Sequence, residues 1–309
     1  MIKFSLIIPV APDRNAEIIE SISHIDYPKS KFQVIVVKGK NPSENRNKGA
    51  AQAKGEFLAF LDDDAVIDKD ILKNAENFFG NNKNIDIVGG PQLTPKDEKG
   101  FALKSGYALS SKFGAWKMAN RYSGTKEVYD VDETMLTSAN LFCKKRVFDK
   151  IKFDPNLFPG EDPKFIEDAK KEGYKVAYSP NLIVYHRRRA TLKGLIKQIF
   201  NYGKTRPKKE SLINTIKKPF FVIPSLFVLY LVGLMILSFI SYSYIWFIPL
   251  GLYLLMDFLF SIYESVKNNS FYSIFYLIFI FPIIHISYGL GMILGSLTKL
   301  KPKKNTNTQ

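Results

Sequence analysis

The sequence predicts an α/β domain built on a parallel sheet, followed by helices that cross a membrane. Over residues 1–190, short apolar runs alternate with segments of helical spacing, as in βαβ units. One of these runs, residues 57–61, leads directly into three adjacent carboxylates. Residues 219–256 and 268–298 contain no charged side chain, and a bilayer span needs about 20 apolar residues.

The individual elements follow from apolar periodicity. Strands are predicted where apolar residues run together, at 4–9, 33–37, 57–61, 85–88, 135–142, 176–178 and 182–185. Helices are predicted where apolar residues recur every three or four positions, at 16–25, 45–53, 68–79, 144–151, 163–172 and 191–202. Residues 92–133 are less regular and are expected to include a mobile loop on the acceptor side of the domain.

Changes in composition divide the chain into four parts. The α/β domain is assigned to 1–190, a basic amphipathic segment that lies in the membrane interface to 191–218, and a polar tail to 299–309. Residues 219–298 form a transmembrane region of two or three spans, near 220–241, 245–263 and 271–297. Pro282 stands in the middle of the third span and leaves the span count open.

Charge and cysteine content narrow the class of protein. The formal net charge is +15 over 309 residues, which favours an anionic partner such as a nucleotide, a lipid phosphate or a membrane surface. Cys143 is the single cysteine, so no internal disulfide is possible, as is usual in a reducing cytosol. The N-terminus leads straight into a predicted strand, and no secretory signal peptide is expected there.

The acidic stretch Asp62–Asp63–Asp64 is the main candidate site. Ligands in open α/β sheets bind where buried strands end, and adjacent carboxylates repel one another unless a cation or donor groups compensate them. Mg²⁺ is commonly held by one or two carboxylates together with substrate phosphates, so the stretch predicts a metal–nucleotide site. The alternative is a solvated acidic turn in which an aspartate caps the following helix.

Two further motifs give these aspartates a context. Arg46-Asn47-Lys48-Gly49 precedes the strand, and Glu161-Asp162 follows about a hundred residues later. In this order the three motifs resemble glycosyltransferase family 2, whose catalytic domain has the GT-A fold. The resemblance implies a Rossmann-like nucleotide-sugar-binding domain with a divalent metal. On the residues alone, Glu161 and Asp162 are equally explained as first-turn charges of a helix.

The resemblance assigns roles to individual residues. Asp62 matches an aspartate near the ribose and the metal, Asp64 matches the metal-binding aspartate, and Asp162, beside Glu161, matches the catalytic base. Nucleotide-sugar contacts are implied for Pro9, Val10, Arg46, Asn47, Asp62 and Asp63. The implied metal ligands, for Mn²⁺ or Mg²⁺, are Asp62, Asp64 and His186. His186 follows a predicted strand, where it is also explained as a histidine hydrogen-bonded at the strand end.

The stretch from Gln198 to Arg206 resembles a segment of membrane-anchored family members of the succinoglycan-synthesis type. Contacts to the acceptor or its diphosphate are implied for Asn140, Gln198, Tyr202, Lys204 and Arg206. The sequence departs from the family after residue 37, where an acid that contacts the base is usual and Lys38 stands instead. A base contact would then come from Asp13, Asn41 or a backbone group.

Together these observations predict an inverting, metal-dependent glycosyltransferase in the cell membrane, multi-pass, with its catalytic domain in the cytoplasm. The expected donor is a nucleotide sugar, a UDP-sugar by resemblance, and the expected acceptor is a polyprenyl-linked saccharide. One alternative is a polyprenyl-phosphate sugar synthase. An alternative from another class is a basic, membrane-anchored binding module without catalysis. Nucleic acid is not an expected partner, because the acidic cluster repels phosphates unless metal is present.

Overall fold

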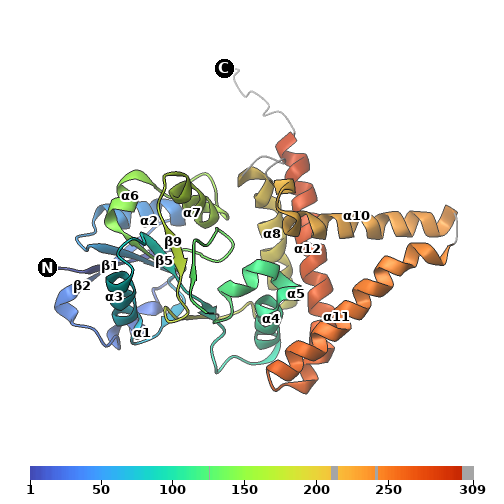
Figure 1. The fold of residues 1–309 in the computed structure, drawn as a ribbon, viewed down its shortest axis with the longest axis horizontal. Coiled ribbons are helices and arrows are strands. Elements are labelled where there is room, and N and C mark those ends of the chain that lie inside the picture. Colours follow the sequence, from blue (N-terminus) through green and yellow to red (C-terminus); the bar gives the residue numbers. More distant parts are fainter. Residues whose placement is uncertain (125, 210–214, 241–242, 301–309) are drawn as a thin grey trace, which may run out of the picture. The chain divides into compact units, whose positions relative to one another are not determined.

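The computed structural model describes residues 1–124, 126–209, 215–240 and 243–300. The chain divides into two compact units, Met1–Arg188 and Arg189–Gln309. The first is a mixed α/β domain and the second consists of helices (Figure 1). Residues 210–214 of the predicted interfacial segment and residues 301–309 of the predicted polar tail lie outside the described residues.

The main sheet has seven strands in the order β2-β1-β3-β8-β5-β9-β7. Their bounds are β1 Phe4–Val10, β2 Phe32–Lys38, β3 Phe57–Leu61, β5 Ile87–Gly89, β7 Val128–Tyr129, β8 Asn140–Lys144 and β9 Val176–Tyr178. β1 is parallel to β2 and to β3, whereas β8 is antiparallel to both of its neighbours, β3 and β5. The sheet is therefore mixed, and the prediction of a parallel sheet holds for only part of it.

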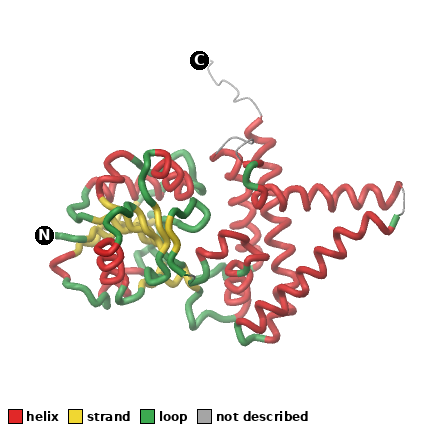
Figure 2. Tube along the Cα trace, in the orientation of Figure 1, coloured by secondary structure: helices red, strands yellow, loops and turns green. Residues whose placement is uncertain are grey.

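A second sheet has three short strands in the order β4-β10-β6 (Figure 2 shows all strands in yellow). The bounds are β4 Ala65–Ile67, β6 Gln92–Leu93 and β10 Val184–His186. β10 runs antiparallel to β4, and this pairing sets His186 opposite Ala65. The second sheet thus places the C-terminal end of β10 beside the segment that follows β3.

The helices of the first unit are α1 Ile18–Ser23, α2 Pro42–Ala51, α3 Ile71–Asn81, α4 Gly100–Ser110, α5 Lys112–Ala115, α6 Lys145–Lys150 and α7 Glu161–Lys171. Short 3₁₀ turns occupy Lys29–Lys31 and Trp116–Arg121. Much of the region 92–133 is therefore helical, although no helix was predicted there, and residues 94–99 and 130–133 lie in loops. Ala102, Ala108 and Leu109 of α4 are buried, so tertiary packing orders a segment without clear periodicity.

The core lies on both faces of the main sheet. Phe57, Ala59 and Leu61 of β3 pack into one apolar cluster, while Leu58 and Phe60 pack into the other. Successive side chains of a strand point to opposite faces, so a central strand covered on both faces reads as a continuous apolar run. The same burial holds the end of β3 firmly in place.

The second unit contains α8 Leu192–Lys209, α10 Pro219–Ile240, α11 Ile248–Lys267 and α12 Ile274–Leu300, with 3₁₀ turns at Tyr244–Phe247 and Phe271–Ser273. Within the described part of the chain, three stretches are long and apolar enough to cross a membrane: Pro219–Ile240, Tyr244–Lys267 and Phe271–Lys299. α8 extends seven residues beyond the predicted end at residue 202 and includes Pro207.

Candidate active site

The segment after β3 carries three carboxylates at the edge of the main sheet. β3 is buried along its whole length between β1 and β8. The side chains of Asp62 and Asp64 are 29% and 30% exposed, whereas that of Asp63 is 7% exposed. Asp62 and Asp64 are therefore accessible to a ligand, and Asp63 lies mostly inside the protein.

β10 brings His186 against these carboxylates. Its Nε2 atom lies 3.1 Å from Oδ1 of Asp64 and 3.9 Å from Oδ2 of Asp62. Its Nδ1 atom lies 3.0 Å from the backbone carbonyl oxygen of Arg187. A carbonyl only accepts hydrogen bonds, so Nδ1 carries a proton. Burial would lower the pKa of His186, but the hydrogen bond to Asp64 raises it; the protonated ring donates from Nε2 to Asp64, and the neutral ring presents its lone pair there.

Asp62, Asp64 and His186 form a donor set that fits a divalent cation. One ligand atom from each residue lies within 4.8 Å of the other two. Carboxylate oxygens suit Mn²⁺ and Mg²⁺, and a neutral imidazole adds a nitrogen ligand. Metal-binding histidines usually donate their other ring N–H to a carbonyl or carboxylate, as His186 does here.

Arg46, on α2, connects this donor set to the start of α7. Its Nη2 atom donates to Oδ1 of Asp62 at 3.1 Å, and its Nη1 atom donates to Oε1 of Glu161 at 3.0 Å. The same Nη1 atom lies 3.9 Å from Oδ1 of Asp162. The Arg46 side chain is 5% exposed, so these ion pairs are shielded from water. One guanidinium thus places three carboxylates relative to one another.

Hydrogen bonds around α2 hold Arg46 in position. The helix begins after Asn41, whose side-chain oxygen accepts the backbone N–H of Ser43 at 3.0 Å. Asn47 donates to the carbonyl of Phe153 at 2.8 Å and accepts its N–H at 3.1 Å. The Arg46 guanidinium also lies over the Phe153 ring, 5.4 Å from its centre. Asn47 therefore fastens α2 to the segment that leads into α7.

Glu161 and Asp162 differ in the use of their carboxylates. Oε2 of Glu161 accepts the backbone N–H of Gly160 at 2.9 Å, and Oε1 is bound to Arg46. Gly160 has φ of +128°, which favours glycine over any residue with a side chain. Oδ1 of Asp162 is buried and accepts no hydrogen bond from any described residue. Asp162 is therefore the carboxylate that is left available for chemistry.

Arg14, in the segment after β1, is a site residue that sequence reasoning missed. Its Nη2 atom donates to Oδ2 of Asp64 at 2.9 Å, and its Nη1 atom lies 3.3 Å from Oδ1 of Asp63. The Arg14 side chain is 44% exposed, in contrast to that of Arg46. A lone arginine in a loop has no periodicity or motif that would have identified it.

The site carries more acid than its cations compensate. Five carboxylates (Asp62, Asp63, Asp64, Glu161 and Asp162) meet two guanidiniums (Arg14 and Arg46). When all five carboxylates are ionised and His186 is neutral, three negative charges remain in excess, and a divalent cation would reduce this excess to one.

The pKa values of the cluster reflect this excess. Burial raises the pKa of Asp62 in spite of Arg46 and His186, and raises that of Asp63 to about 6 in spite of Arg14. Burial and the neighbouring Asp162 raise the pKa of Glu161. Burial would also raise the pKa of Asp64, but hydrogen bonds from His186 and Arg14 hold it well below its usual range. Such opposed shifts in one accessible cluster are typical of functional sites.

Three other predicted site residues of the first unit lie in the interior or at its edge. Pro9 and Val10 end β1 and are buried, and the carbonyl of Val10 accepts the Gly39 N–H at 2.9 Å. Asn140 is 1% exposed, and its amide donates to the carbonyls of Leu182 at 2.5 Å and Pro91 at 3.3 Å. The amide of Asn140 therefore connects β8 to neighbouring segments.

The remaining predicted acceptor residues belong to α8 in the second unit. Nε2 of Gln198 donates to the hydroxyl of Tyr202 at 3.0 Å, and Tyr202 is 41% exposed. Lys204 is partly exposed. Arg206 is 7% exposed, and its guanidinium stacks 3.5 Å above the ring of Phe221. Among these residues, Tyr202 is exposed whereas Arg206 is buried.

The edge after β2 lacks a carboxylate, as the sequence shows. Lys38 ends this strand. The side chain of Asn41 is already engaged, because its oxygen caps α2 and its Nδ2 atom donates to the carbonyl of Pro155 at 2.8 Å. Of the three sources of a base contact considered from the sequence, Asp13 and a backbone group remain.

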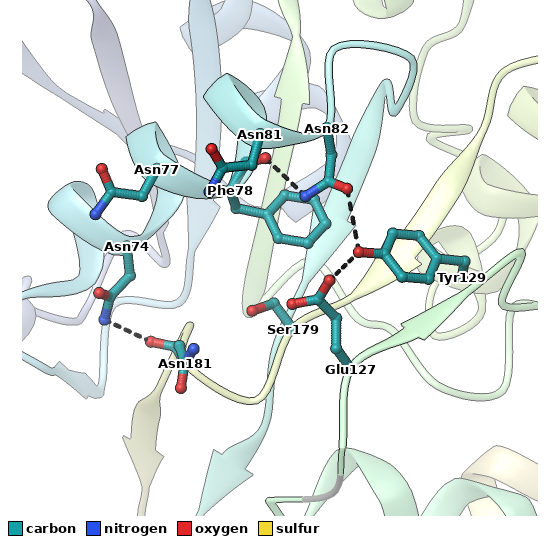
Figure 3. Close-up of a pocket in the computed structure, with 9 residues that line it drawn as sticks. All are labelled: Asn74, Asn77, Phe78, Asn81, Asn82, Glu127, Tyr129, Ser179 and Asn181. Atoms are coloured by element: carbon teal, nitrogen blue, oxygen red, sulfur yellow. Dashed lines mark hydrogen bonds between the residues drawn. The ribbon is translucent and has the colours of Figure 1, made fainter.

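A separate cavity of about 400 Å³ lies between the C-terminal half of α3, the strand β7 and the turn after β9 (Figure 3). Its lining is rich in amides, with Asn74, Asn77, Asn81, Asn82 and Asn181. Asn74 donates to the carbonyl of Asn181 at 2.9 Å, and Tyr129 donates to Oδ1 of Asn82 at 3.1 Å. None of the predicted site residues lines this cavity.

Comparison with known proteins shows which family of proteins the chain resembles in sequence. The model of a family described as "Glycosyltransferase like family 2" matches residues 3–202, about two thirds of the chain. The minor teichoic acid biosynthesis protein GgaB of Bacillus subtilis (strain 168) is 27% identical over 214 residues, which cover 67% of this chain and 20% of that protein. The chain therefore spans only about a fifth of that relative's length.

Two further proteins are similar over more of their own length. A dolichyl N-acetyl-α-D-glucosaminyl phosphate 3-β-D-2,3-diacetamido-2,3-dideoxy-β-D-glucuronosyltransferase of Methanococcus voltae is 23% identical over 237 residues, covering 64% of this chain and 71% of that protein. The mannosyltransferase PcManGT of Pyrobaculum calidifontis, solved with GDP-Man and Mn²⁺, shares the fold with a TM-score of 0.63 at 13% identity, over 96% of this chain and 88% of that one. The family match covers both sheets and every element of the acidic cluster, and the chain belongs to glycosyltransferase family 2.

Proposed function

We propose that this glycosyltransferase moves a sugar, with inversion, from a nucleotide-sugar donor to a hydroxyl of a lipid-linked saccharide. The observation that carries the proposal is the position of Asp162. Its Oδ1 atom has no hydrogen-bond partner among the described residues and lies 3.9 Å from Arg46. The same arginine binds Asp62, one of the three candidate metal ligands. A free carboxylate therefore stands beside a site suited to a metal and a diphosphate.

Each group has a defined task in this reaction. Asp62, Asp64 and His186 hold the divalent cation, which when bound neutralises the leaving diphosphate as a Lewis acid. Asp162 accepts the proton of the acceptor hydroxyl, whose oxygen attacks the anomeric carbon on the face opposite the diphosphate. Glu161 does not take that proton directly, because both of its oxygens are engaged; it positions Arg46.

The donor is proposed to lie along the edge formed by β1, α2 and the end of β3. The residues assigned to it are Pro9, Val10, Arg46, Asn47, Asp62 and Asp63. A UDP-sugar is the proposed donor, although the acid that usually contacts the base is replaced by Lys38. An enzyme rejects the wrong base strongly when that base leaves a buried polar group of the site without a hydrogen bond. Because the carboxylate is missing here, we expect weaker discrimination between nucleobases.

The acceptor is proposed to be polyprenyl-linked, and the enzyme to be a multi-pass protein of the cell membrane with its α/β domain in the cytoplasm, where nucleotide sugars are available. The candidate membrane-spanning helices support a membrane location, and the Methanococcus relative, named for a dolichyl N-acetyl-α-D-glucosaminyl phosphate acceptor, supports a lipid-linked acceptor. In this organisation residues 1–190 bind the donor, 191–218 lie at the membrane and 219–298 anchor the chain. Acceptor contacts are proposed for Asn140, Gln198, Tyr202, Lys204 and Arg206.

The polyprenyl-phosphate alternative differs in its need for a base. A lipid phosphate is already ionised, so its attack requires no proton acceptor. Oδ1 of Asp162, which has no hydrogen-bond partner among the described residues, favours a hydroxyl acceptor over that alternative. A membrane-anchored module that only binds would leave the nucleotide sugar intact and would need no base.

The decisive experiment replaces Asp162 by asparagine. Turnover on a hydroxyl acceptor should fall by roughly 10²–10⁴, the usual contribution of a general base. Donor affinity should remain, because Asp162 lies on the acceptor side. Asp168→Asn is the matched control: Asp168 lies on the same helix and pairs with Lys164 at the surface, so turnover should be unchanged.

The acceptor separates the outcomes. If Asp162→Asn loses turnover on a soluble saccharide acceptor but not on a polyprenyl phosphate, the residue is the base. Near-normal turnover of Asp162→Asn on the hydroxyl acceptor would remove Asp162 from that role. If the wild-type protein consumes no nucleotide sugar with any acceptor, the binding-module alternative is correct.

A further inference from the structure

Two helices of the second unit, α8 and α12, run side by side in unusually close contact (Figure 1). A Cβ atom on Gly291 would lie 2.1 Å from the carbonyl oxygen of Phe200, and one on Gly295 would lie 2.2 Å from that of Lys204. Nearer the end of the pair, Lys299 donates to the carbonyl of Pro207. The contacts advance in the same direction along both helices, so α8 and α12 are parallel.

α8 is too polar to lie in the hydrocarbon of a bilayer. It carries six basic residues and no acid: Lys193, Lys197, Lys204, Arg206, Lys208 and Lys209. Each arginine or lysine at the centre of a membrane helix costs about 2.5–3.5 kcal/mol. α8 therefore lies outside the hydrocarbon core, and the part of α12 in backbone contact with it, from Gly291 to Lys299, lies at the same depth.

The middle of α12 is held near the entry of α10. A Cβ atom on Gly289 would lie 2.3 Å from the carbonyl oxygen of Pro224 and 2.8 Å from Val228. Pro224 comes only six residues after Lys218, the last charged residue before this span. Figure 1 shows α10 leading away across α12 instead of running alongside it. Pro224 and Val228 both belong to the first half of α10, so the middle of α12 packs against that half.

The beginning of α12 belongs to the same side. α11 ends in polar residues, with Glu264 paired to Lys267 at 3.2 Å and Asn268 donating to the Glu264 carbonyl at 2.7 Å. A single 3₁₀ turn, Phe271–Ser273, then leads into α12. If α10 and α11 cross the membrane as a hairpin, this polar end returns to the side where α10 begins. The start and the end of α12 are then on the same side.

An upright α12 does not keep its start and its end on one side. A helix of 27 residues is about 40 Å long, more than the roughly 30 Å of the hydrocarbon core, so its ends would lie on opposite sides of the membrane. Its large exposed side chains instead form one stripe: Phe275, Tyr276, Phe279, Leu290, Leu294 and Leu297. At 100° per residue these six positions fall within a sector of about 100°, turned away from Gly291 and Gly295.

We infer that α12 is not a third span but lies in the plane of the interface, as the apolar partner of the basic helix α8. The pair presents cations on one helix and exposed apolar side chains along one face of the other, the combination that binds the boundary between headgroups and acyl chains of an anionic leaflet. Only α10 and α11 then cross the membrane, and Lys299 remains with the other basic residues, as the positive-inside tendency requires. This inference does not depend on the reaction proposed above.

Depth measurements on the full-length protein test the orientation. Single nitroxide labels are placed at Phe279, Leu290 and Leu297 on α12, and at Leu229 and Ile236 on α10, all of which are exposed. The protein is reconstituted in phosphatidylethanolamine–phosphatidylglycerol vesicles, and label depth is measured by power-saturation EPR with oxygen and a nickel chelate. Cys143 is fully buried, and the unsubstituted protein controls for its labelling.

The two orientations predict different gradients. An in-plane α12 places its three labels within about 8 Å of one another in depth, whereas the α10 labels, seven residues apart, differ by about 10 Å. An upright α12 separates residues 279 and 297 by about 27 Å. A difference above about 8 Å between these two labels overturns the inference.

A second measurement reads the side of the membrane. Cysteines are introduced at Lys299 and, as the reference, at the exposed Lys171 of the α/β domain, and sealed vesicles are treated with a membrane-impermeant maleimide. The inference predicts that both positions are labelled from the same side. Labelling of the two positions from opposite sides contradicts it.

Discussion

Asp86 and the acidic cluster around Arg46 differ in how the negative charge of their carboxylates is compensated. Asp86 is a single acid with Arg146 at 2.5 Å, Lys144 at 3.5 Å and the backbone N–H of Lys175 at 3.1 Å. At the end of β3, five acids share two arginines. The first arrangement satisfies a charge completely, and the second leaves room for a cation and for a free base. The extent to which neighbouring cations and N–H groups compensate the carboxylate charge, more than burial, distinguishes a structural acid from a functional one.

The largest effect is expected from Arg46, on which the acidic cluster depends. Replacing it by methionine leaves Glu161 and Asp62 without their partner, and removing one member of a buried ion pair costs about 3–5 kcal/mol. Turnover should fall by at least about 10², since the metal site and the base lose their common support. Activity assays and urea unfolding measure both effects.

The controls for this variant are on the same residue and the same helix. Arg46→Lys restores the charge but cannot reach both carboxylates with a fork of donors, so an intermediate loss is expected. Lys48→Met, at a position 64% exposed on α2, should have no effect on either quantity. Wild-type turnover in Arg46→Met would show that catalysis does not need the Arg46 guanidinium.

A smaller effect, confined to stability, is expected at Asp86. The Arg146 hydrogen bond and the Lys175 N–H lower the pKa of Asp86, although burial opposes them. Asp86→Asn should reduce the free energy of unfolding by about 2 kcal/mol, the usual worth of hydrogen bonds to a charged group, with unchanged Mn²⁺ affinity. If Asp86→Asn changed the Mn²⁺ affinity as much as a substitution of Asp64 does, Asp86 and the acidic cluster would not differ in function.

The pH dependence of the same variant gives an independent check. An acid whose pKa is lowered by folding stabilises the folded state above its unfolded pKa of about 3.9, and this contribution is lost as the pH falls through the lower folded value. The stability difference between wild type and Asp86→Asn should therefore be full at pH 7 and shrink below about pH 4. Urea unfolding at pH 7 and pH 3 measures it, and a difference that grows toward pH 3 has the wrong sign.

The smallest effect is expected at Arg14, the half-exposed cation of the acidic cluster. Its Nη2 atom donates a hydrogen bond of 2.9 Å to Oδ2 of Asp64, a candidate metal ligand, and so competes with a metal for that carboxylate. Arg14→Gln should raise Mn²⁺ affinity in the absence of nucleotide about two- to fivefold, because an exposed ion pair is worth at most about 1 kcal/mol. Arg187→Gln, which removes an exposed arginine paired with Asp97, is the control. Weaker Mn²⁺ binding in Arg14→Gln would mean that Arg14 supports the cation instead of competing with it.

The acidic cluster was largely predictable, because its members follow local patterns. A buried strand leads into Asp62–Asp64, and the order of Arg46, these aspartates and Glu161-Asp162 carries the family resemblance. The different states of Glu161 and Asp162 were not predictable. They depend on where the Arg46 guanidinium points and on the backbone at Gly160, which no spacing encodes.

The apolar patterns of the sequence did not predict the direction in which strands and helices run. Periodicity identifies a strand but not its direction, so the antiparallel β8 was missed in a sheet expected to be parallel. Apolar length identifies a helix that is able to cross a membrane but not the direction of its axis, and α12 satisfies that length in full. Both properties are decided by contacts between segments distant in sequence, such as those at Gly291 and Gly295.

The central claim, that the acids after β3 form a metal site, is tested most directly by Mn²⁺ binding. The EPR signal of free Mn²⁺ is titrated with the wild-type protein, Asp64→Asn, and the control Asp97→Asn, whose side chain is 67% exposed and paired with Arg187. We expect wild type and Asp97→Asn to bind Mn²⁺, more tightly when UDP is present, and Asp64→Asn to bind it in neither condition. Equal Mn²⁺ binding by Asp64→Asn and wild type would contradict the account.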